Sequence, residues 1–376
     1  MIEENLLYEY APITNEKLKN YLYENDNLDD YFSIKRDVIK PKNFCGVLHI
    51  EGEDFYILPK ISQDDFKNKN IFIYMLMSAY DVKLKNEDIS TSANEKHEII
   101  EVFIQLFTNT LIKELQRGLY KQYITYQDDL QVLRGKYLIN ENLKHNFTKQ
   151  KIYCEFDEFS PDNALNQFFL YAIRIFLRHS KQKKSLKMCE LILDEVAYQH
   201  IDISKIEIHF DRLNVRYKKS FEIAIMILKR YIPLFEKDKQ SFAFLFDMNE
   251  LFEKFVGGMI PDAKLQNQKD FGNLRLKPDI MIENLIIDTK YKKVSSKDDL
   301  STADKYQMFA YGKNFQVKNT MLLYPKYIDG VYENLVLGKD EECVNLAMRS
   351  LDLEFDGGYE GFVVEMGKRI KRILFG

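Results

Sequence analysis

The sequence has no tryptophan, only four cysteines and only six histidines among its 376 residues. The cysteines, at positions 45, 154, 189 and 343, are far apart and form no C-x-x-C pair, and no two histidines are spaced as in H-x-x-x-H. These absences argue against a structural zinc site. Widely separated cysteines are typical of a reducing compartment, so we expect a cytoplasmic protein.

Targeting, membrane and nucleotide-binding signals are missing as well. The first ten residues, MIEENLLYEY, are acidic and contain no apolar core, so we expect no signal peptide. No apolar run approaches the length that spans a bilayer, so no membrane partner is expected. The chain has no G-x-x-x-x-G-K-[ST] loop and therefore no evident nucleotide engine of its own. Its net charge is -4, so any surface that binds nucleic acid must be local.

What is present suffices for two or three domains with hydrophobic cores, because 45% of the residues are hydrophobic. We predict a mixed domain over residues 1–95, a mainly helical region over 96–240 and a third domain over 241–376. In the first, GVLHIEGEDFYILPKI alternates around the turn EGED and predicts a hairpin. The apolar stretch KNIFIYMLMSAYDV predicts a buried helix.

The middle region begins with KHEIIEVFIQLFTNTLIKELQRGLY, whose apolar residues recur at helical spacing. The extended stretch RGLYKQYITYQDDLQVLRGKYLI then interleaves basic and aromatic residues. It could contact a polyanion, although a solvated domain surface is the favoured interpretation. Ser160, followed by Pro161 and Asp162, predicts the start of the next helix.

The last third changes character. A helix over FDMNELFEKFVGGMI precedes an apolar hairpin, PDIMIENLIIDTKYKK, which spans residues 278–293. A helix over KYQMFAYGKNF and a strand over TMLLYP follow. This order predicts an α/β sandwich within a chain of the mixed α+β or α/β class.

The hairpin contains charges that a buried strand rarely tolerates without partners or a role. A tight turn at Glu283–Asn284 pairs Ile280 with Ile287 and places Asp279 opposite Asp288, while Lys290 shares a strand face with Asp288. Two such carboxylates repel unless a cation lies between them.

Oxygen ligands of this kind favour Mg²⁺, with Mn²⁺ as a substitute. A neighbouring lysine stabilises the charge that develops on a phosphate or, with a lowered pKa, helps to activate water. The pattern predicts a site for phosphodiester hydrolysis. On the D-T-K triplet alone, a plain salt bridge of Asp288 with Lys290 or Lys292 is the favoured alternative.

Neighbouring elements favour the catalytic interpretation. Glu253 lies on the preceding helix and is a candidate third metal ligand or water orienter, although an exposed helix glutamate is the simpler reading. Gln307 and Tyr311 share a helix face and could reach a phosphate or the lysine, although Tyr311 could equally be core. Between Lys264 and Lys297 there are eight basic and four acidic residues, a local basic rim that suits a DNA backbone.

These residues resemble a known family. PD…DTK, preceded by a helix glutamate and followed by YQMFAY, looks like the PD-(D/E)XK nuclease core. By that resemblance the catalytic set is Glu253, Asp279, Asp288, Lys290, Gln307 and Tyr311, with the first three as metal ligands. The upstream blocks GVLHI…FYILPKI, RGLYKQY, LRGKYLI, CEFDEFSPDNALNQFFLYAI and FLFDMNELFEKFV are similar to the McrC family, the nuclease subunits of McrBC-type 5-methylcytosine restriction systems.

The resemblance implies an Mg²⁺-dependent endonuclease acting on double-stranded DNA. It also implies an AAA+ GTPase partner, a McrB-like hexamer contacted by the N-terminal half of this chain, with the domain of residues 1–95 as the expected contact. Two other functions stay open, a stand-alone repair nuclease and a non-catalytic adaptor of an AAA+ motor. The complete set of acids and lysine argues against the adaptor. The lack of a DNA-reading module argues against the stand-alone enzyme.

Overall fold

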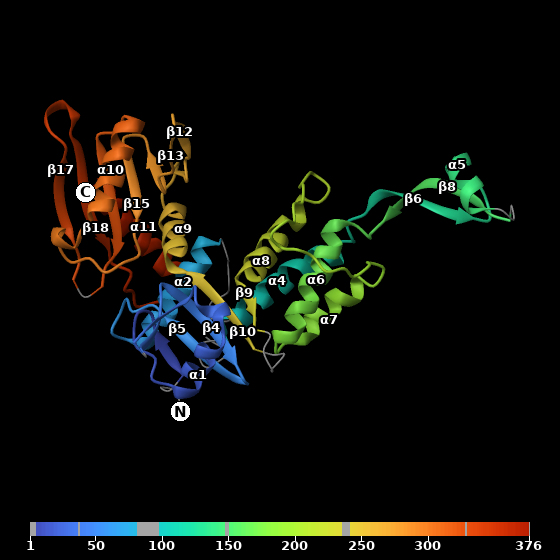
Figure 1. Cartoon of the computed structure of the whole chain (residues 1–376), viewed down its shortest axis with the longest axis horizontal. Coiled ribbons are helices and arrows are strands. Elements are labelled where there is room, and N and C mark those ends of the chain that lie inside the picture. Colours follow the sequence, from blue (N-terminus) through green and yellow to red (C-terminus); the bar gives the residue numbers. More distant parts are fainter. Residues whose placement is uncertain are drawn as a thin grey trace. The chain divides into compact units, whose positions relative to one another are not determined.

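The structure is a computed structural model that describes residues 5–36, 38–80, 98–146, 150–234, 241–327 and 329–375 (Figure 1). It divides into two compact units, Met1–Ile99 with Arg230–Gly376, and Ile100–Lys229. The two ends of the chain form one unit because strand β10 (Phe242–Asp247) pairs antiparallel with β4 (Phe44–Ile50). The three-part division at residues 95 and 240 stays a prediction, and a cut at 240 separates β10 from its partner strand.

The first sheet of the larger unit has the order β1-β5-β4-β10-β9. The predicted hairpin is confirmed as β4 and β5 (Glu53–Leu58), joined at Ile50 and Glu53. The two turn residues, Glu51 and Gly52, both have positive φ, the conformation that matches the twist of a two-residue hairpin. The remaining strands are β1 (Leu6–Tyr8) and β9 (Tyr231–Pro233), and β2 (Phe32–Lys35) forms a separate hairpin with β3 (Val38–Pro41).

The second sheet has the order β11-β14-β15-β16-β18-β17. Its central strands β15, β16 and β18 are parallel, and its outer pairs are antiparallel. Helix α10 (Thr302–Phe315) connects β15 to β16, as a parallel pair requires. The strands are β11 (Lys264–Leu265), β14 (Ile280–Ile282), β15 (Leu285–Thr289), β16 (Asn319–Pro325), β17 (Tyr332–Leu337) and β18 (Val344–Leu351), with a separate hairpin of β12 (Lys269–Phe271) and β13 (Leu274–Leu276).

Helices cover both faces of this second sheet. Helix α10 packs Met308 and Tyr311 against Leu322 and Leu346 on one face. On the other, α9 (Met248–Gly258) contacts β15 and α11 (Tyr359–Phe375) contacts β18. Helix α2 (Asp65–Ala79), the predicted buried helix, packs against α9, α11 and β5 and so links the two sheets. The larger unit is thus a mixed α/β structure with several sheets.

The smaller unit has a helical body. Its helices are α4 (Glu98–Gln116), α6 (Ala164–His179), α7 (Lys183–Ile192) and α8 (Lys218–Arg230). Helix α1 (Glu16–Glu24) belongs to the larger unit. Phe107 of α4 packs its ring against Phe176 of α6, with 5.1 Å between centroids. The predicted helix start at Ser160 is wrong, because Ser160 ends a strand and Asn163 caps α6 through Asn166 N.

A hairpin arm extends from this body, as Figure 1 shows for β6 and β8. We define the arm as residues 122–160, of which 122–146 and 150–160 are described. Strand β6 (Gln122–Leu130) pairs along its whole length with β8 (Ile152–Ser160), and the far end carries β7 (Lys136–Tyr137) and α5 (Ile139–His145). In the part of the chain that is described, no helix has both the length and the apolar character to cross a membrane.

Candidate active site

The β14–β15 hairpin has the register predicted from its sequence. Ile282 pairs with Leu285, and Ile280 with Ile287. Asp288, on β15, is only 1% exposed. Lys290 follows the strand and places Nζ 2.6 Å from Asp288 Oδ2, so the two share a face and form an ion pair. A buried carboxylate therefore lies against an ammonium group at the carboxyl end of β15.

Asp279 lies just before the paired part of the hairpin, and its side chain is fixed by the residue that follows Asp288. Its Oδ2 accepts hydrogen bonds from both N and Oγ1 of Thr289, each at 2.8 Å. Its backbone oxygen accepts a third, from Gln266 N, also at 2.8 Å. The side chain is thereby held to the residue after Asp288, because the ladder ends at Ile280 and does not extend to Asp279.

Burial, together with the charge of Asp279, raises the pKa of Asp288 to about 7, against the opposing effect of Lys290. Burial acts to lower the pKa of Lys290, but Asp288 and Asp279 outweigh it and raise that pKa. This direction is opposite to the lowered pKa that would help Lys290 to activate water. Lys290 stays an ammonium group that is suited to stabilising negative charge rather than to removing a proton.

Glu253, half-buried on α9, faces the same site. Its Oε1 accepts a hydrogen bond from Gln266 Nε2 at 2.9 Å. Burial and then the charge of Asp279 raise its pKa, which shows that the two carboxylates interact. Within the described ranges, however, no three side chains of His, Cys, Asp or Glu form a cluster that could hold a metal ion. Asp279 thus interacts electrostatically with Glu253 and with Asp288, but the three carboxylates do not form one set of ligands.

Gln307 and Tyr311, on α10, form a chain of hydrogen bonds to the same segment. Gln307 Nε2 donates to Tyr311 Oη at 2.9 Å, and Tyr311 Oη donates to the backbone oxygen of Lys277 at 3.0 Å. Tyr311 belongs to the core between α10 and the sheet. Burial and then Asp288 raise its pKa to about 12. Tyr311 is therefore both a core residue and the anchor of the backbone two residues before Asp279.

Several residues of this site were not predicted from the sequence. Thr289 stands between Asp288 and Lys290 in the motif, and its role is visible only once Asp279 turns toward it. Gln266 joins Glu253 to Asp279 from a stretch without pattern. Of the two salt bridges considered for Asp288, the one with Lys290 is formed, whereas Lys292 pairs with the buried Asp304 of α10.

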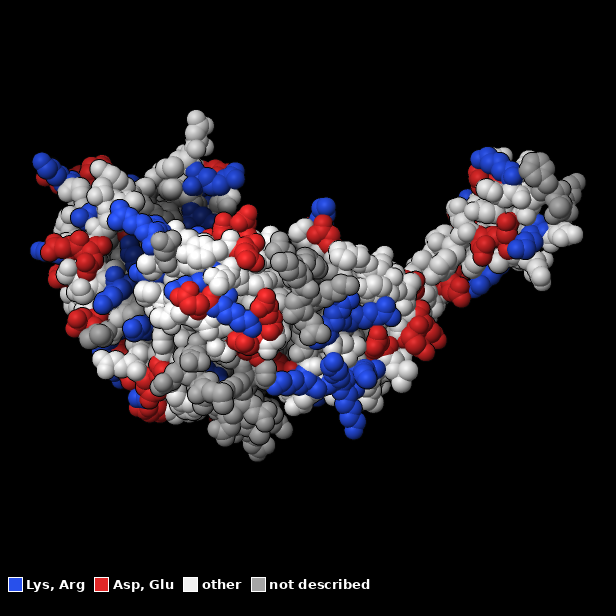
Figure 2. Space-filling model, turned by 60° about the horizontal axis from the view of Figure 1, so that its bottom comes forward, with Lys and Arg blue, Asp and Glu red and all other residues white. Residues whose placement is uncertain are grey.

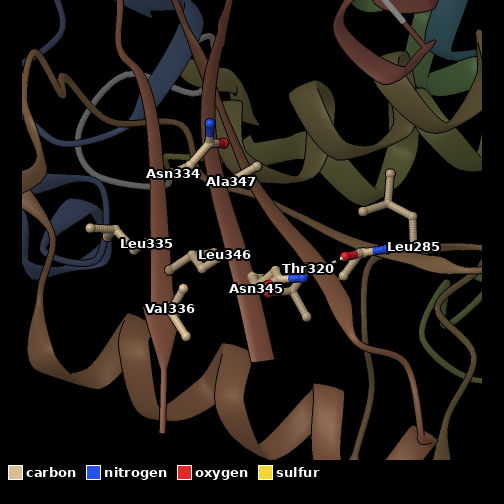
Figure 3. Close-up of a pocket in the computed structure, with 9 residues that line it drawn as sticks. Leu285, Thr320, Asn334, Leu335, Val336, Asn345, Leu346 and Ala347 are labelled. Carbon is tan, nitrogen blue, oxygen red and sulfur yellow. Dashed lines mark hydrogen bonds between the residues drawn. The ribbon is translucent and has the colours of Figure 1, made fainter. Parts of the chain in front are cut away.

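A pocket of about 320 Å³ lies elsewhere on the same sheet (Figure 3). It is lined by Leu285, Asn319, Asn345 and residues beside them, near the first residues of β15, β16 and β18. Asn345 Nδ2 donates to Asn319 Oδ1 at 3.0 Å across it. Asp288 is at the opposite, carboxyl end of β15, and no titratable side chain lines the pocket, so it offers nothing for acid–base or metal chemistry.

Comparisons with known proteins agree with this architecture. The family model described as "McrBC 5-methylcytosine restriction system component" matches residues 39–325, so the chain belongs to that family. A search of curated proteins gave no match.

Two solved structures are similar. One is a half-complex from a tetradecameric assembly of Thermococcus gammatolerans McrB AAA+ hexamers with bound McrC, with 22% identity over 98% of each chain and a TM-score of 0.62. The other is the McrBC complex of Thermococcus gammatolerans, with 26% identity over 67% of this chain and 85% of that chain and a TM-score of 0.48. The first likeness concerns the fold of nearly the whole chain.

Proposed function

We propose that this chain is the Mg²⁺-dependent DNA endonuclease subunit of a GTP-driven, modification-dependent restriction complex. Its residues 241–376 then act as a PD-(D/E)XK nuclease domain. The observation that supports this most strongly is the buried Asp288, paired with Lys290 and close to Asp279 at the carboxyl end of β15. An acid whose pKa is strongly raised by burial and then by a second acid is typical of a reactive site.

The donor chemistry of the site fits a divalent cation. Asp279 and Asp288 supply only oxygen ligands, which suit Mg²⁺ or Mn²⁺. Burial and then the charge of Asp279 raise the pKa of Asp288. Such an ion supplies Lewis-acid activation of a phosphoryl oxygen and a more acidic water molecule. In this proposal Asp279 and Asp288 hold the ion, and Glu253 completes its shell or orients water.

The remaining residues act on the substrate and on the backbone. Lys290, as an ammonium group, stabilises the charge that develops on the scissile phosphate. Thr289 fixes the carboxylate of Asp279 through two hydrogen bonds. Gln307 and Tyr311 hold the segment that leads to Asp279. A pure adaptor has no need for this arrangement of paired and anchored charges.

Charge distribution favours a subunit over a stand-alone nuclease. Among the described residues on the face shown in Figure 2, small groups of basic side chains alternate with small groups of acidic ones. The chain as a whole has a net charge of -4. Because non-specific DNA binding depends on phosphate neutralisation, a partner that holds the DNA would compensate.

The arm is the best candidate for the contact with an AAA+ GTPase partner, a McrB-like hexamer. It exposes a set of large apolar side chains that a soluble surface rarely gathers, namely Tyr123, Val132, Leu133, Tyr137, Ile139, Leu143 and Phe159. An exposed apolar surface of this kind suits a protein partner.

Reconstitution tests the proposal. The purified chain, the AAA+ GTPase partner, GTP and Mg²⁺ should together cleave DNA that carries 5-methylcytosine. Omission of the partner, GTP or Mg²⁺ should each prevent efficient cleavage. Efficient cleavage by the chain with Mg²⁺ alone would instead support a stand-alone repair nuclease, and stimulation of GTP turnover without any cleavage would support an adaptor.

A further inference from the structure

The segment that leads into Asp279 has an alternating pattern of burial. Leu276, Pro278 and Ile280 are buried, whereas Arg275 and Lys277 are exposed and Asp279 is partly exposed. Alternation with period two is the signature of an extended chain with two distinct faces. Arg275, Lys277 and Asp279 therefore share the face that is turned toward solvent.

This segment is fixed to the core on its other face. Leu276 belongs to the core cluster that contains Tyr311. The backbone oxygen of Lys277 accepts the hydrogen bond from Tyr311 Oη. One strand earlier, Phe271 of the β12–β13 hairpin packs its ring against Phe315 of α10, with 5.1 Å between centroids. A residue on such an anchored backbone presents its side chain in a defined place.

The two cations on the solvent face are available to a ligand. Lys277 forms no ion pair with any residue in the described ranges. Its ammonium group nevertheless acts on Glu253, whose pKa it tends to lower, behind the larger effects of burial, Asp279 and Gln266. Arg275 pairs with Asp270 at 2.8 Å, but both side chains are more than half exposed, and such surface pairs contribute little.

We propose that Lys277, with Arg275 behind it, binds the DNA phosphates that flank the scissile phosphodiester. This rests on the proposed function, since it names the part of the substrate that segment 275–279 would guide. Two residues of extended chain span roughly 6.6 Å, and one DNA strand has a phosphate every ~3.4 Å along its axis. Lys277 thus faces a phosphate one or two nucleotides from the group bound at Asp279. A lysine that is merely solvated would contribute nothing specific to binding.

The direct test is the salt dependence of DNA binding by the full-length chain. A duplex oligonucleotide is titrated at several salt concentrations with Ca²⁺ in place of Mg²⁺, so that binding is measured without turnover. Lys277→Ala should weaken binding severalfold and reduce the slope of log K against log salt by about 0.9, the value for one lost phosphate contact. Lys277→Arg, which keeps the charge, should retain the wild-type slope.

The matched control is Lys318→Ala. Lys318 is also exposed, but it precedes β16 at the amino end of the parallel strands, away from Asp288. Its removal should leave the slope unchanged. A wild-type slope for Lys277→Ala, an equal loss for Lys318→Ala, or the absence of measurable wild-type binding at low salt would each overturn the phosphate contact.

The cleavage assay of the reconstituted complex separates this inference from the proposed function. A wild-type complex that cleaves DNA, together with an unchanged slope for Lys277→Ala, refutes only the phosphate contact. A wild-type complex that never cleaves, together with the expected loss of slope, leaves the phosphate contact standing and refutes the endonuclease.

Discussion

The β14–β15 hairpin and the antiparallel pair of β6 and β8 in the arm have opposite surfaces. The first buries charge, with Asp288 almost inaccessible beside Lys290. The second exposes apolar groups, with Val132 and Leu133 near its far end. Burying charge and exposing apolar side chains both cost free energy. Each hairpin therefore carries a feature that folding alone does not favour.

The difference teaches which kind of ligand each hairpin is suited to. A buried ion pair with a second carboxylate nearby is suited to a small, charged ligand such as a cation or a phosphate. An exposed apolar surface is suited to another protein, whose contact removes it from water. The comparison predicts that changes in one hairpin affect cleavage and changes in the other affect partner stimulation, with little overlap.

The largest effect is expected for Asp288→Asn. The substitution keeps the size of the side chain but removes the charge that a cation and Lys290 require. Loss of several kcal/mol of electrostatic stabilisation corresponds to a fall in cleavage of roughly 10³-fold. Single-turnover cleavage by the reconstituted complex measures it, and GTP turnover by the partner should be unchanged.

Glu283→Gln is the control for this variant, because Glu283 is an exposed acid at the turn of the same hairpin. It should cleave like the wild type. If Asp288→Asn lost GTPase stimulation as well as cleavage, with its thermal stability intact, the separation between the two hairpins would not hold.

The next effect is expected in the arm. Replacing both Val132 and Leu133, which are 75% and 55% exposed, by serine should leave the free energy of unfolding nearly unchanged. A contact residue at the centre of an interface contributes about 2 kcal/mol or more, so GTPase stimulation at subsaturating chain should fall roughly 30-fold. The rate of GTP turnover by the partner is the measurement.

Leu191→Ser serves as the matched control in the same unit. Leu191 is an equally exposed apolar residue on α7, outside the arm. Undiminished stimulation by the arm variant, or an equal loss with Leu191→Ser, would show that exposed hydrocarbon on this unit does not mark the partner contact.

A smaller effect is expected for Tyr311→Phe. The ring stays in the core, and only the hydroxyl that holds the oxygen of Lys277 is lost. A hydrogen bond of this kind contributes about 1–1.5 kcal/mol, so cleavage should fall roughly tenfold. Tyr306→Phe, on the exposed side of the same helix, should have no effect. Full activity of Tyr311→Phe in single-turnover cleavage would mean that Tyr311 is a core residue alone.

Much of the candidate site follows from local pattern. The apolar run and the short turn fix the register of the β14–β15 hairpin, and period-two alternation then places Lys290 beside Asp288. Helical spacing likewise places Gln307 next to Tyr311. These relations connect residues a few positions apart, and backbone geometry alone determines them.

The rest depends on contacts between distant parts of the chain. Strand β10 joins β4 across 200 residues, and the join needs Gly46, where a Cβ would lie 2.0 Å from the oxygen of Phe244. Gln266 reaches Asp279 from a segment with no periodicity. The pKa of Lys290 depends on a balance between burial and three acids, which no sequence pattern expresses.

Glu9 can be compared with Asp288, because it is also a buried acid but has no role in the proposed chemistry. It is 4% exposed on the chain just after β1 and accepts hydrogen bonds from Lys60 N at 3.1 Å and Tyr291 Oη at 2.8 Å. Burial, opposed by these two bonds, raises its pKa to about 7. Tyr10, Tyr327 and Cys45 also face it, and none of these is a cation.

The smallest effect on cleavage is therefore expected for Glu9→Gln, together with a clear effect on stability. A folded-state pKa near 7, above the usual value of 4.5, means that the native protein binds the proton more tightly than the unfolded chain. The stability that this provides is complete below pH 4.5 and is lost as the pH rises through 7, by up to about 3 kcal/mol.

Glu9→Gln should thus be more stable than the wild type at pH 8, with a smaller difference at pH 5, as urea unfolding midpoints would show. The exposed Glu16→Gln is the matched control for the loss of a carboxyl group. Glu9→Gln should not abolish cleavage as Asp288→Asn does. If it did, burial of a carboxylate alone would be enough to make it essential for cleavage. The charge of Asp279 beside Asp288 would then no longer distinguish a reactive carboxylate from a structural one.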